Sequence, residues 1–479
     1  MHAATRSAFL MILAVLATAG PAASARAAGG ITWTPCPDDT TARCGTLSVP
    51  VDWADPSSGR IGVAVARRPA TDPAHRIGTL VVNPGGPGES GVDFALGTFF
   101  SAALRSRFDL VGFDPRGVGR SHPVICSRAL VEAAPSPLIT SRQQYGAVVA
   151  YNRRLAADCR TRTGPLYGHV DTLSVVRDLD ALRSALGEER ISFYGASYGT
   201  VLGEQYADRF PGRVRAVVLD SVLDHGAAVG DVLGTGASAA QDAFDQFVAW
   251  CARDRACALH GRDVRGLWAG LLARAAAGTL RDPFAAGRPV SVFGLLNVAF
   301  SSFYAPQWHS LAYYMKEAGA PAPRTASVPG RPHAFPAIMC ADWDLPISGY
   351  SALVRTLRVL RGRAPQMMVS PLLLTAAVGC LGRDTPPANP QRPLRPAATP
   401  VLVLGTRHDP ATPYRWARRV AVRLGPAARL VTYRGSGHIA YGRSDCLIGV
   451  VDHFLFTGRT PAAGTACPAV PPSPFGVGT

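Results

Sequence analysis

The chain has 479 residues, of which 47% are hydrophobic and 17% are charged, and its formal net charge is +16. This length suits one large domain with an insertion, or two domains, and the apolar fraction excludes a chain that is disordered throughout. The charge is not typical of a nucleic-acid binder, because Lys316 is the only lysine and the arginines are scattered without a run of five or more. We therefore expect no nucleic-acid partner.

Residues 1–27 have the features of a secretory signal peptide. Arg6 precedes an apolar run over residues 8–19, and Ala-x-Ala sequences follow at 23–25 and 25–27. The apolar run is shorter than the roughly 20 residues that span a bilayer, and no later stretch is long enough either. We predict a secreted protein without stable membrane insertion.

Ten cysteines, an even number, are typical of an exported chain. No Cys-x-x-Cys pair suggests zinc or a redox dithiol, so we expect disulfides and no metal. The sequence alone leaves the connectivity open, and pairing between sequence neighbours is the simplest hypothesis. It joins Cys36 to Cys44, Cys126 to Cys159, Cys251 to Cys257, Cys340 to Cys380, and Cys446 to Cys467.

Short apolar, β-branched segments alternate with helical patterns along most of the chain. Near-continuous apolar strands separated by helices predict a mostly parallel sheet that is covered by helices on both faces. The predicted strands are residues 45–51, 61–66, 79–82, 108–113, 191–194, 214–219, 401–404 and 429–433. The clearest predicted helices are residues 172–187, the segment after Gly199 to about 210, and 445–456.

The strand pattern is interrupted between residues 225 and 395, where the chain is rich in Ala and Leu and helix-like. We predict that this segment is a helical cap inserted over one end of the strands. The core is then in two parts, residues 28–224 and residues 396–479, and the second part carries the candidate acid and histidine described below.

The central motif is Gly195-Ala196-Ser197-Tyr198-Gly199, between a predicted strand and a predicted helix. In this context a G-x-S-x-G sequence forms a sharp turn that exposes the serine hydroxyl above a sheet. The motif predicts an α/β-hydrolase fold with Ser197 as the nucleophile. The alternative is a serine that caps the N-terminus of the helix.

A serine nucleophile needs a general base, and in this fold the order along the chain is serine, acid, histidine. His438 follows the last predicted strand on a Gly-rich loop and is our candidate base. Asp409 follows strand 401–404 and is the candidate acid, with Asp220 as the alternative. His408 adjoins that acid and His453 lies in an apolar helix, so neither is favoured.

The oxyanion of an acyl-transfer reaction needs two backbone N–H donors. The residue after the nucleophile, Tyr198, is one candidate donor. The loop after strand 79–82 supplies the other, for which Gly86 is the first choice and Gly85 the second.

The same loop contains a G-x-G-x-x-G sequence at residues 86–91, and Asp109 follows at about the spacing of a dinucleotide-binding motif. A dinucleotide-binding oxidoreductase is therefore a remote alternative. Pro87 argues against it, because proline removes an amide donor from the turn that would hold pyrophosphate. A catalytically inactive binding protein is a third class, without support because all three triad residue types are present. Walker A and H-E-x-x-H motifs are absent.

The chain also carries an ordered set of short motifs. They are Ile31-Thr32-Trp33, Val49-Pro50-Val51-Asp52, Asn83-Pro84-Gly85-Gly86-Pro87-Gly88, Asp114-Pro115-Arg116-Gly117, Asp178-Leu179-Asp180, Ser197-Tyr198-Gly199-Thr200, Asp409-Pro410 with Thr412-Pro413, Gly437-His438, and the Cys36, Cys44, Cys446 and Cys467 positions. This set resembles the secreted tripeptidyl aminopeptidase family of actinobacterial α/β-hydrolases, which is related to prolyl aminopeptidases. The resemblance implies Ser197, Asp409 and His438 as the triad and cleavage of short peptides from a free N-terminus.

The chain departs from this family at two places. Asp220-Ser221 stands where the family usually has Asp-Gly, and Glu89 replaces a small residue in the glycine loop. Glu89 is a candidate partner for a substrate ammonium, against the alternative of a solvated carboxylate. Asp342 in the cap is a similar candidate.

Taken together, the sequence predicts a secreted serine exopeptidase that acts on peptides with a free N-terminus and needs no cofactor or metal. A carboxylesterase with the same triad is the leading alternative, because the fold alone does not decide the substrate.

Overall fold

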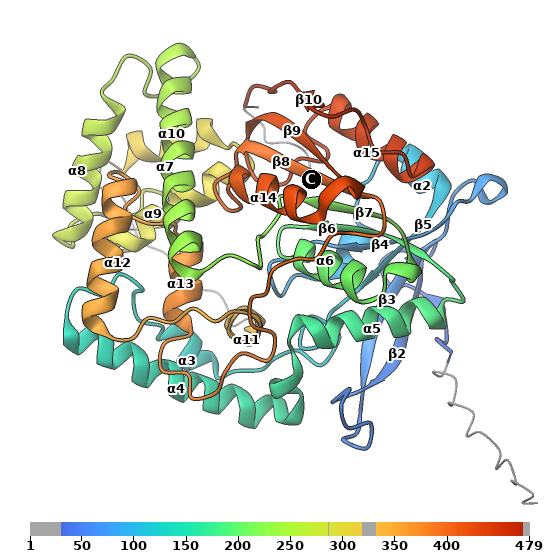
Figure 1. Ribbon diagram of the computed structural model, residues 1–479. Helices are drawn as coiled ribbons and strands as arrows, with labels where there is room; N and C mark the ends of the chain where they lie inside the picture. Colours follow the sequence, from blue (N-terminus) through green and yellow to red (C-terminus); the bar gives the residue numbers. More distant parts are fainter. Residues whose placement is uncertain (1–29, 286, 319–331, 473–479) are drawn as a thin grey trace, which may run out of the picture.

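The computed structural model describes residues 30–285, 287–318 and 332–472, and the predicted signal peptide lies outside these ranges (Figure 1). A ten-stranded sheet in the order β1-β2-β3-β5-β4-β6-β7-β8-β9-β10 forms the centre of the described chain. The strands are β1 (Thr34–Pro35), β2 (Arg43–Pro50), β3 (Arg60–Arg68), β4 (Gly78–Asn83), β5 (Phe108–Phe113), β6 (Ile191–Ala196), β7 (Val214–Asp220), β8 (Val401–His408), β9 (Ala428–Ser436) and β10 (Ala466–Cys467).

The sheet is antiparallel at its first edge and parallel elsewhere. Strands β1, β2, β3 and β5 pair antiparallel, and all pairs from β5 through β4 to β10 are parallel. All six residues of β5 and of β6 are buried, as expected for parallel strands covered on both faces. The prediction of a mostly parallel sheet is confirmed. The two-residue strands β1 and β10 are additional, being too short to give a periodic pattern.

Helices cover both faces of the sheet, and the side chains of each strand alternate between them. Val81 belongs to the core beneath α5, α6 and α14, whereas Leu80 and Val82 belong to the core beneath α1, α2 and α15. Figure 1 shows α2 and α15 on one side of the sheet and α5 and α6 on the other. These helices are α1 (Gly91–Leu96), α2 (Ala102–Arg107), α5 (Thr172–Ala185), α6 (Gly199–Arg209), α14 (Tyr414–Leu424) and α15 (Asp445–Thr457).

The described residues between β7 and β8 form helices gathered to one side of the sheet (Figure 1). We call residues 225–395 the cap. Its helix α7 packs on α12 and α13. The side-chain amide of Asn152, in the core helix α4 (Arg142–Thr163), donates to the cap carbonyls of Val378 and Leu381 at 2.8 and 3.0 Å. The cap helices are α7 (Val229–Arg253), α8 (Val264–Ala276), α9 (Val292–Tyr304), α10 (Trp308–Glu317), α11 (Ala334–Asp342), α12 (Tyr350–Arg363) and α13 (Pro371–Gly379).

The remaining helices lie in the connections of the core. They are α3 (Arg128–Glu132), α4 (Arg142–Thr163) and the short 3-10 helices η1 (Pro73–His75), η2 (Gly164–His169), η3 (Pro211–Arg213) and η4 (Gly425–Ala427). Across the described ranges, no helix combines the length and the apolar character needed to cross a membrane.

All ten cysteines lie in described segments and form five disulfides, so none of them is free. The predicted pairing of sequence neighbours is confirmed. The bonds join Cys36 to Cys44, Cys126 to Cys159, Cys251 to Cys257, Cys340 to Cys380, and Cys446 to Cys467.

Candidate active site

Ser197 lies on the turn that joins β6 to α6, in a left-handed backbone conformation with φ of 54°. A non-glycine residue rarely adopts this conformation unless the surroundings enforce it. Two hydrogen bonds do so here. The Ser197 N–H donates to the carbonyl of Asp220 at 2.8 Å, and the Thr200 hydroxyl donates to the Ser197 carbonyl at 2.7 Å. The sharp turn predicted from the G-x-S-x-G motif is present.

The two glycines of the motif are required by close backbone approaches. A Cβ atom on Gly195 would lie 2.3 Å from the carbonyl oxygen of Gly199, and one on Gly199 would lie 2.6 Å from the carbonyl oxygen of Asn83. Both distances are below van der Waals contact, so a larger residue at either position forces helix α6 away from the sheet.

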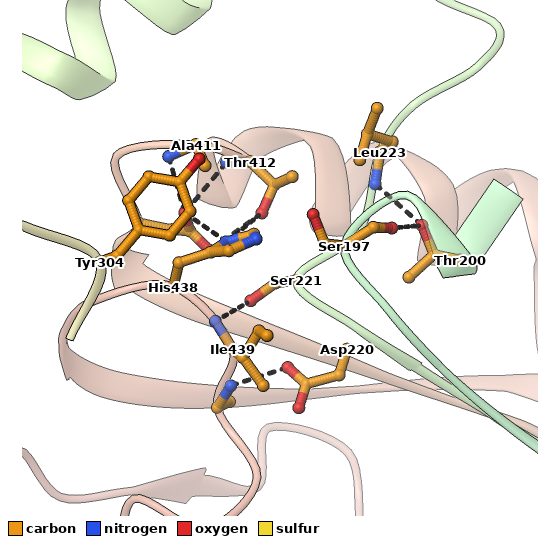
Figure 2. Close-up of polar contacts among 12 residues, drawn as sticks. Ser197, Thr200, Asp220, Ser221, Leu223, Tyr304, Ala411, Thr412, His438 and Ile439 are labelled. Atoms are coloured by element: carbon orange, nitrogen blue, oxygen red, sulfur yellow. Dashed lines mark hydrogen bonds and ion pairs between the residues drawn. The ribbon is translucent and has the colours of Figure 1, made fainter. Parts of the chain in front are cut away.

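His438 and Asp409 follow two neighbouring strands, β9 and β8, and meet at the same edge of the sheet. The Nδ1 atom of His438 lies 3.0 Å from each carboxylate oxygen of Asp409. Figure 2 shows the Ser197 side chain facing the imidazole of His438. The structure therefore brings together the three residues that the sequence predicts as a triad. With Nδ1 engaged by the carboxylate, Nε2 is the nitrogen available to accept a proton from serine.

Asp409 is completely buried, yet its surroundings favour the carboxylate form. Burial by itself raises the pKa of the group, but the charge of His438 and hydrogen bonds from His438 and from the amides of Thr412 and Ala411 outweigh it, so the pKa of Asp409 is lowered. Those amides donate at 2.9 and 2.8 Å, and the Thr412 hydroxyl donates to the second oxygen at 2.9 Å. A fixed carboxylate holds one tautomer of His438 and stabilises its protonated form.

Asp220, the alternative acid, serves a different part of the site. Its carboxylate accepts hydrogen bonds from the Tyr194 hydroxyl at 2.7 Å and from the amides of Ala440 and Tyr441 at 2.8 and 2.9 Å. Burial raises the pKa of Asp220 despite these bonds. The Nδ1 atom of His438 is bonded to Asp409, so Asp409 and not Asp220 lies where the acid of a triad orients the imidazole.

The glycine loop after β4 packs directly against the turn of the nucleophile. A Cβ atom on Gly85 would lie 2.7 Å from the Tyr198 nitrogen, and the Gly85 N–H already donates to the Asn83 side chain at 3.0 Å. Among the hydrogen bonds of the described residues, neither the Gly86 N–H nor the Tyr198 N–H has an acceptor. These two amides are therefore the pair available for an oxyanion, and Gly85 is the weaker candidate.

Glu89 is exposed on this loop, and its side chain lies beside the proposed oxyanion donor. A Cβ atom on Gly86 would lie 3.1 Å from Cγ of Glu89. The carboxylate of Glu89 is thus free to meet a charged group of a substrate that enters from solvent.

Asp342 does not have that freedom. Its side chain is buried, and its two oxygens accept bonds from the Thr172 amide and hydroxyl, the Tyr198 hydroxyl at 2.6 Å and the Asn389 amide at 2.9 Å. The expectation that Asp342 anchors a substrate amine is corrected, because no carboxylate lone pair remains for it. Asp342 instead joins the cap to the residue that follows Ser197.

The structure also argues against the dinucleotide-binding alternative. Asp109, which would hold a ribose, is buried and accepts hydrogen bonds from Arg67 at 2.6 Å, Arg76 at 2.8 Å and the Ala70 amide at 2.8 Å. Its carboxylate is thereby used within the core.

Comparisons with known proteins agree with this geometry. A family model described as the alpha/beta hydrolase fold matches residues 78–443. This chain belongs to the α/β-hydrolase family. Over 91% of either chain, the hydrolase is 32% identical to the serine protease Hip1 of Mycobacterium tuberculosis. It is 32% identical to the tripeptidyl aminopeptidase of Streptomyces lividans, over 94% of this chain and 89% of that one. It is 33% identical to carboxylesterase B of Mycobacterium tuberculosis, over 89% and 86%. The resemblance to actinobacterial tripeptidyl aminopeptidases is confirmed.

Two contacts of the hydrolase were not expected from its sequence. The Thr412 hydroxyl lies between Asp409 and His438, 3.4 Å from His438 Nδ1, and its place three residues after the acid was the available signal. From the cap, the Tyr304 carbonyl accepts the His438 N–H at 2.7 Å, and the two rings stand edge to face at 4.9 Å. Nothing in the sequence around Tyr304 indicates this contact, which depends on how α9 reaches over the core.

Proposed function

We propose that this serine hydrolase is an aminopeptidase that releases short peptides, of tripeptidyl length, from free N-termini. The observation that carries the proposal is the Ser197 turn facing a His438 ring that Asp409 holds, in a chain that matches a tripeptidyl aminopeptidase and a serine protease over nine-tenths of its length. The exposed carboxylate of Glu89 beside Gly86 supports recognition of a substrate ammonium.

In the proposed mechanism, the Ser197 hydroxyl attacks the carbonyl carbon of the scissile peptide bond as His438 accepts its proton. The amides of Gly86 and Tyr198 stabilise the oxyanion. Protonated His438 then donates a proton to the leaving amine, which leaves an ester between Ser197 and the released peptide. Water, deprotonated by His438, hydrolyses this ester and restores the serine. Asp409 keeps its charge throughout and orients the imidazole.

A carboxylesterase is the second candidate, because one relative that covers most of the chain has that name. The same triad would form and hydrolyse an acyl-enzyme from a simple ester. The two candidates differ in whether a free ammonium on the substrate contributes to binding.

A panel of fluorogenic substrates separates these candidates. We expect free tripeptidyl substrates to be hydrolysed with a higher kcat/KM than their N-blocked forms, than shorter peptides, and than simple esters. The Ser197→Ala variant should lose both hydrolysis and labelling by a fluorophosphonate, while Glu89→Gln should lower kcat/KM only for free N-termini. Equal hydrolysis of blocked and free peptides would overturn the aminopeptidase proposal, and activity on esters alone would favour the esterase.

We also propose that the protein is exported. The five disulfides are typical of an oxidising compartment, and the predicted signal peptide supplies the route.

A further inference from the structure

One dipeptide at the end of β7, Asp220-Ser221, contacts the turn that carries Ser197. The carbonyl of Asp220 accepts the Ser197 N–H at 2.8 Å, and the N–H of Ser221 donates to the carbonyl of Leu404 in β8 at 3.2 Å. Both residues of the dipeptide are buried. It is therefore fixed to the central sheet and touches the backbone of the nucleophile.

The same dipeptide also holds the loop that carries His438 (Figure 2). The Ser221 hydroxyl oxygen accepts the N–H of Ile439 at 2.8 Å, and the Asp220 carboxylate accepts the next two amides, at residues 440–441, at 2.8 and 2.9 Å. Three consecutive amides after His438 are thus bonded to one rigid point of the sheet. Because the same dipeptide also bonds to the Ser197 backbone, it fixes the position of the His438 loop relative to Ser197.

The backbone at both ends of the bond between Ser221 and Ile439 is unusual. Ser221 has φ of 57° and Ile439 has φ of 67°, in the left-handed region that favours glycine. A serine is unfavourable there compared with a glycine. The feature that serine adds is its hydroxyl, and the hydroxyl accepts the amide directly after His438.

We propose that the Ser221 hydroxyl is a positioning group for His438, which it holds at the distance from Ser197 that proton transfer requires. The proposal rests on the proposed function in so far as His438 is the general base for Ser197. It assigns to Ser221 no contact with the substrate. Its effect is on the rate of acylation and not on substrate binding.

Two substitutions separate the hydroxyl from the backbone. Ser221→Ala removes the hydroxyl and keeps the unfavourable left-handed backbone, whereas Ser221→Gly removes the hydroxyl and relieves the backbone. We expect both variants to lose kcat by about tenfold with KM within about twofold of wild type, and to react with a fluorophosphonate correspondingly more slowly. Their melting temperatures should differ, with Ser221→Gly the more stable of the two.

The proposal is overturned if kcat follows stability, with Ser221→Gly close to wild type and Ser221→Ala low, or if neither variant slows labelling. Ser221→Gly decides by itself, because its backbone is relieved: a kcat about tenfold below wild type supports the proposal, and a kcat close to wild type overturns it. His122→Gly relieves the same kind of backbone, with φ of 50°, at an exposed residue and should leave kcat unchanged. Because labelling requires no particular substrate, a wild type that cleaves esters but not peptides contradicts the aminopeptidase proposal and leaves this test intact.

Discussion

At the scale of single residues, the carboxylate of Asp409 is subject to two opposing electrostatic effects. Burial makes a charge costly, whereas orientation of His438 needs that charge. The charge and hydrogen bond of His438 offset the cost of burial, together with the amides of Thr412 and Ala411, which point at the carboxylate because the chain turns directly after β8. The neighbouring acid, Asp220, is bonded to the amides after His438 and not to its ring, although it also lies at a strand end.

Replacing Asp409 by asparagine tests this assignment. Asparagine keeps the shape of the side chain, but its amide group can donate to Nδ1 and favour the wrong tautomer of His438. We expect kcat of Asp409→Asn to fall by about 10⁴-fold with the melting temperature little changed. The matched variant Asp220→Asn keeps one of the two oxygens that accept amides of its loop, does not change the partner of His438 Nδ1, and should lose much less. A larger loss of kcat in Asp220→Asn than in Asp409→Asn would assign the acid role to Asp220.

At the scale of elements, two of the five disulfides lie in the cap and close loops of very different length. The bond between Cys340 and Cys380 joins α11 to the residue after α13, across a sequence separation of 40. The bond between Cys251 and Cys257 closes a much shorter loop at the end of α7, with a separation of 6. In the chain-entropy view, the longer loop restricts the unfolded state more strongly.

We therefore expect the double variant Cys340→Ser with Cys380→Ser to lose about 4 kcal/mol of unfolding free energy, and Cys251→Ser with Cys257→Ser to lose about 2 kcal/mol. Denaturant unfolding followed by circular dichroism measures both. The reverse order of losses would show that local packing, and not chain entropy, sets the contribution of these bonds.

At the scale of the whole molecule, a buried polar network connects the cap to the core beneath the site. Asp342 of α11 accepts hydrogen bonds from Thr172 and Tyr198 of the core, and its backbone carbonyl lies 2.7 Å from Nε2 of His225. Burial raises the pKa of Asp342 to about 6, although the bonds from Thr172 and Tyr198 lower it. The carboxyl group of Asp342 therefore stays protonated to a higher pH than an exposed carboxyl group does.

The sign of the resulting pH dependence follows from this raised pKa. The folded state favours the protonated carboxyl, so the stabilisation is complete below the ordinary value of 3.8 and is lost as the pH rises to about 6. We expect this group to reduce the unfolding free energy by about 3 kcal/mol over that interval. In Asp342→Asn, which cannot titrate, this part of the slope should be missing. Identical slopes for both proteins in guanidinium unfolding between pH 4 and 6 would contradict the prediction.

Much of this hydrolase was determined by local sequence patterns. The positions of the eight longer strands along the chain, the turn at Ser197 and the choice of candidate acid and base follow from apolar runs, glycine spacing and positions at strand ends. These features are local, because each depends on residues close together in the chain. The disulfide pairing was also the one expected from neighbouring cysteines.

Only the tertiary structure decided the contacts between segments far apart in the sequence. It turned Asp342 from a candidate substrate anchor into a buried junction, placed the Tyr304 carbonyl on the His438 amide, and joined Ser221 to Ile439. Whether a carboxylate faces solvent or four protein donors depends on how the cap packs on the core, and no short stretch of sequence records that packing. The hydrogen bond of Ser221 could not be predicted from the sequence either. Its hydroxyl gains a partner only because β7 and the loop after β9 meet at one edge of the sheet.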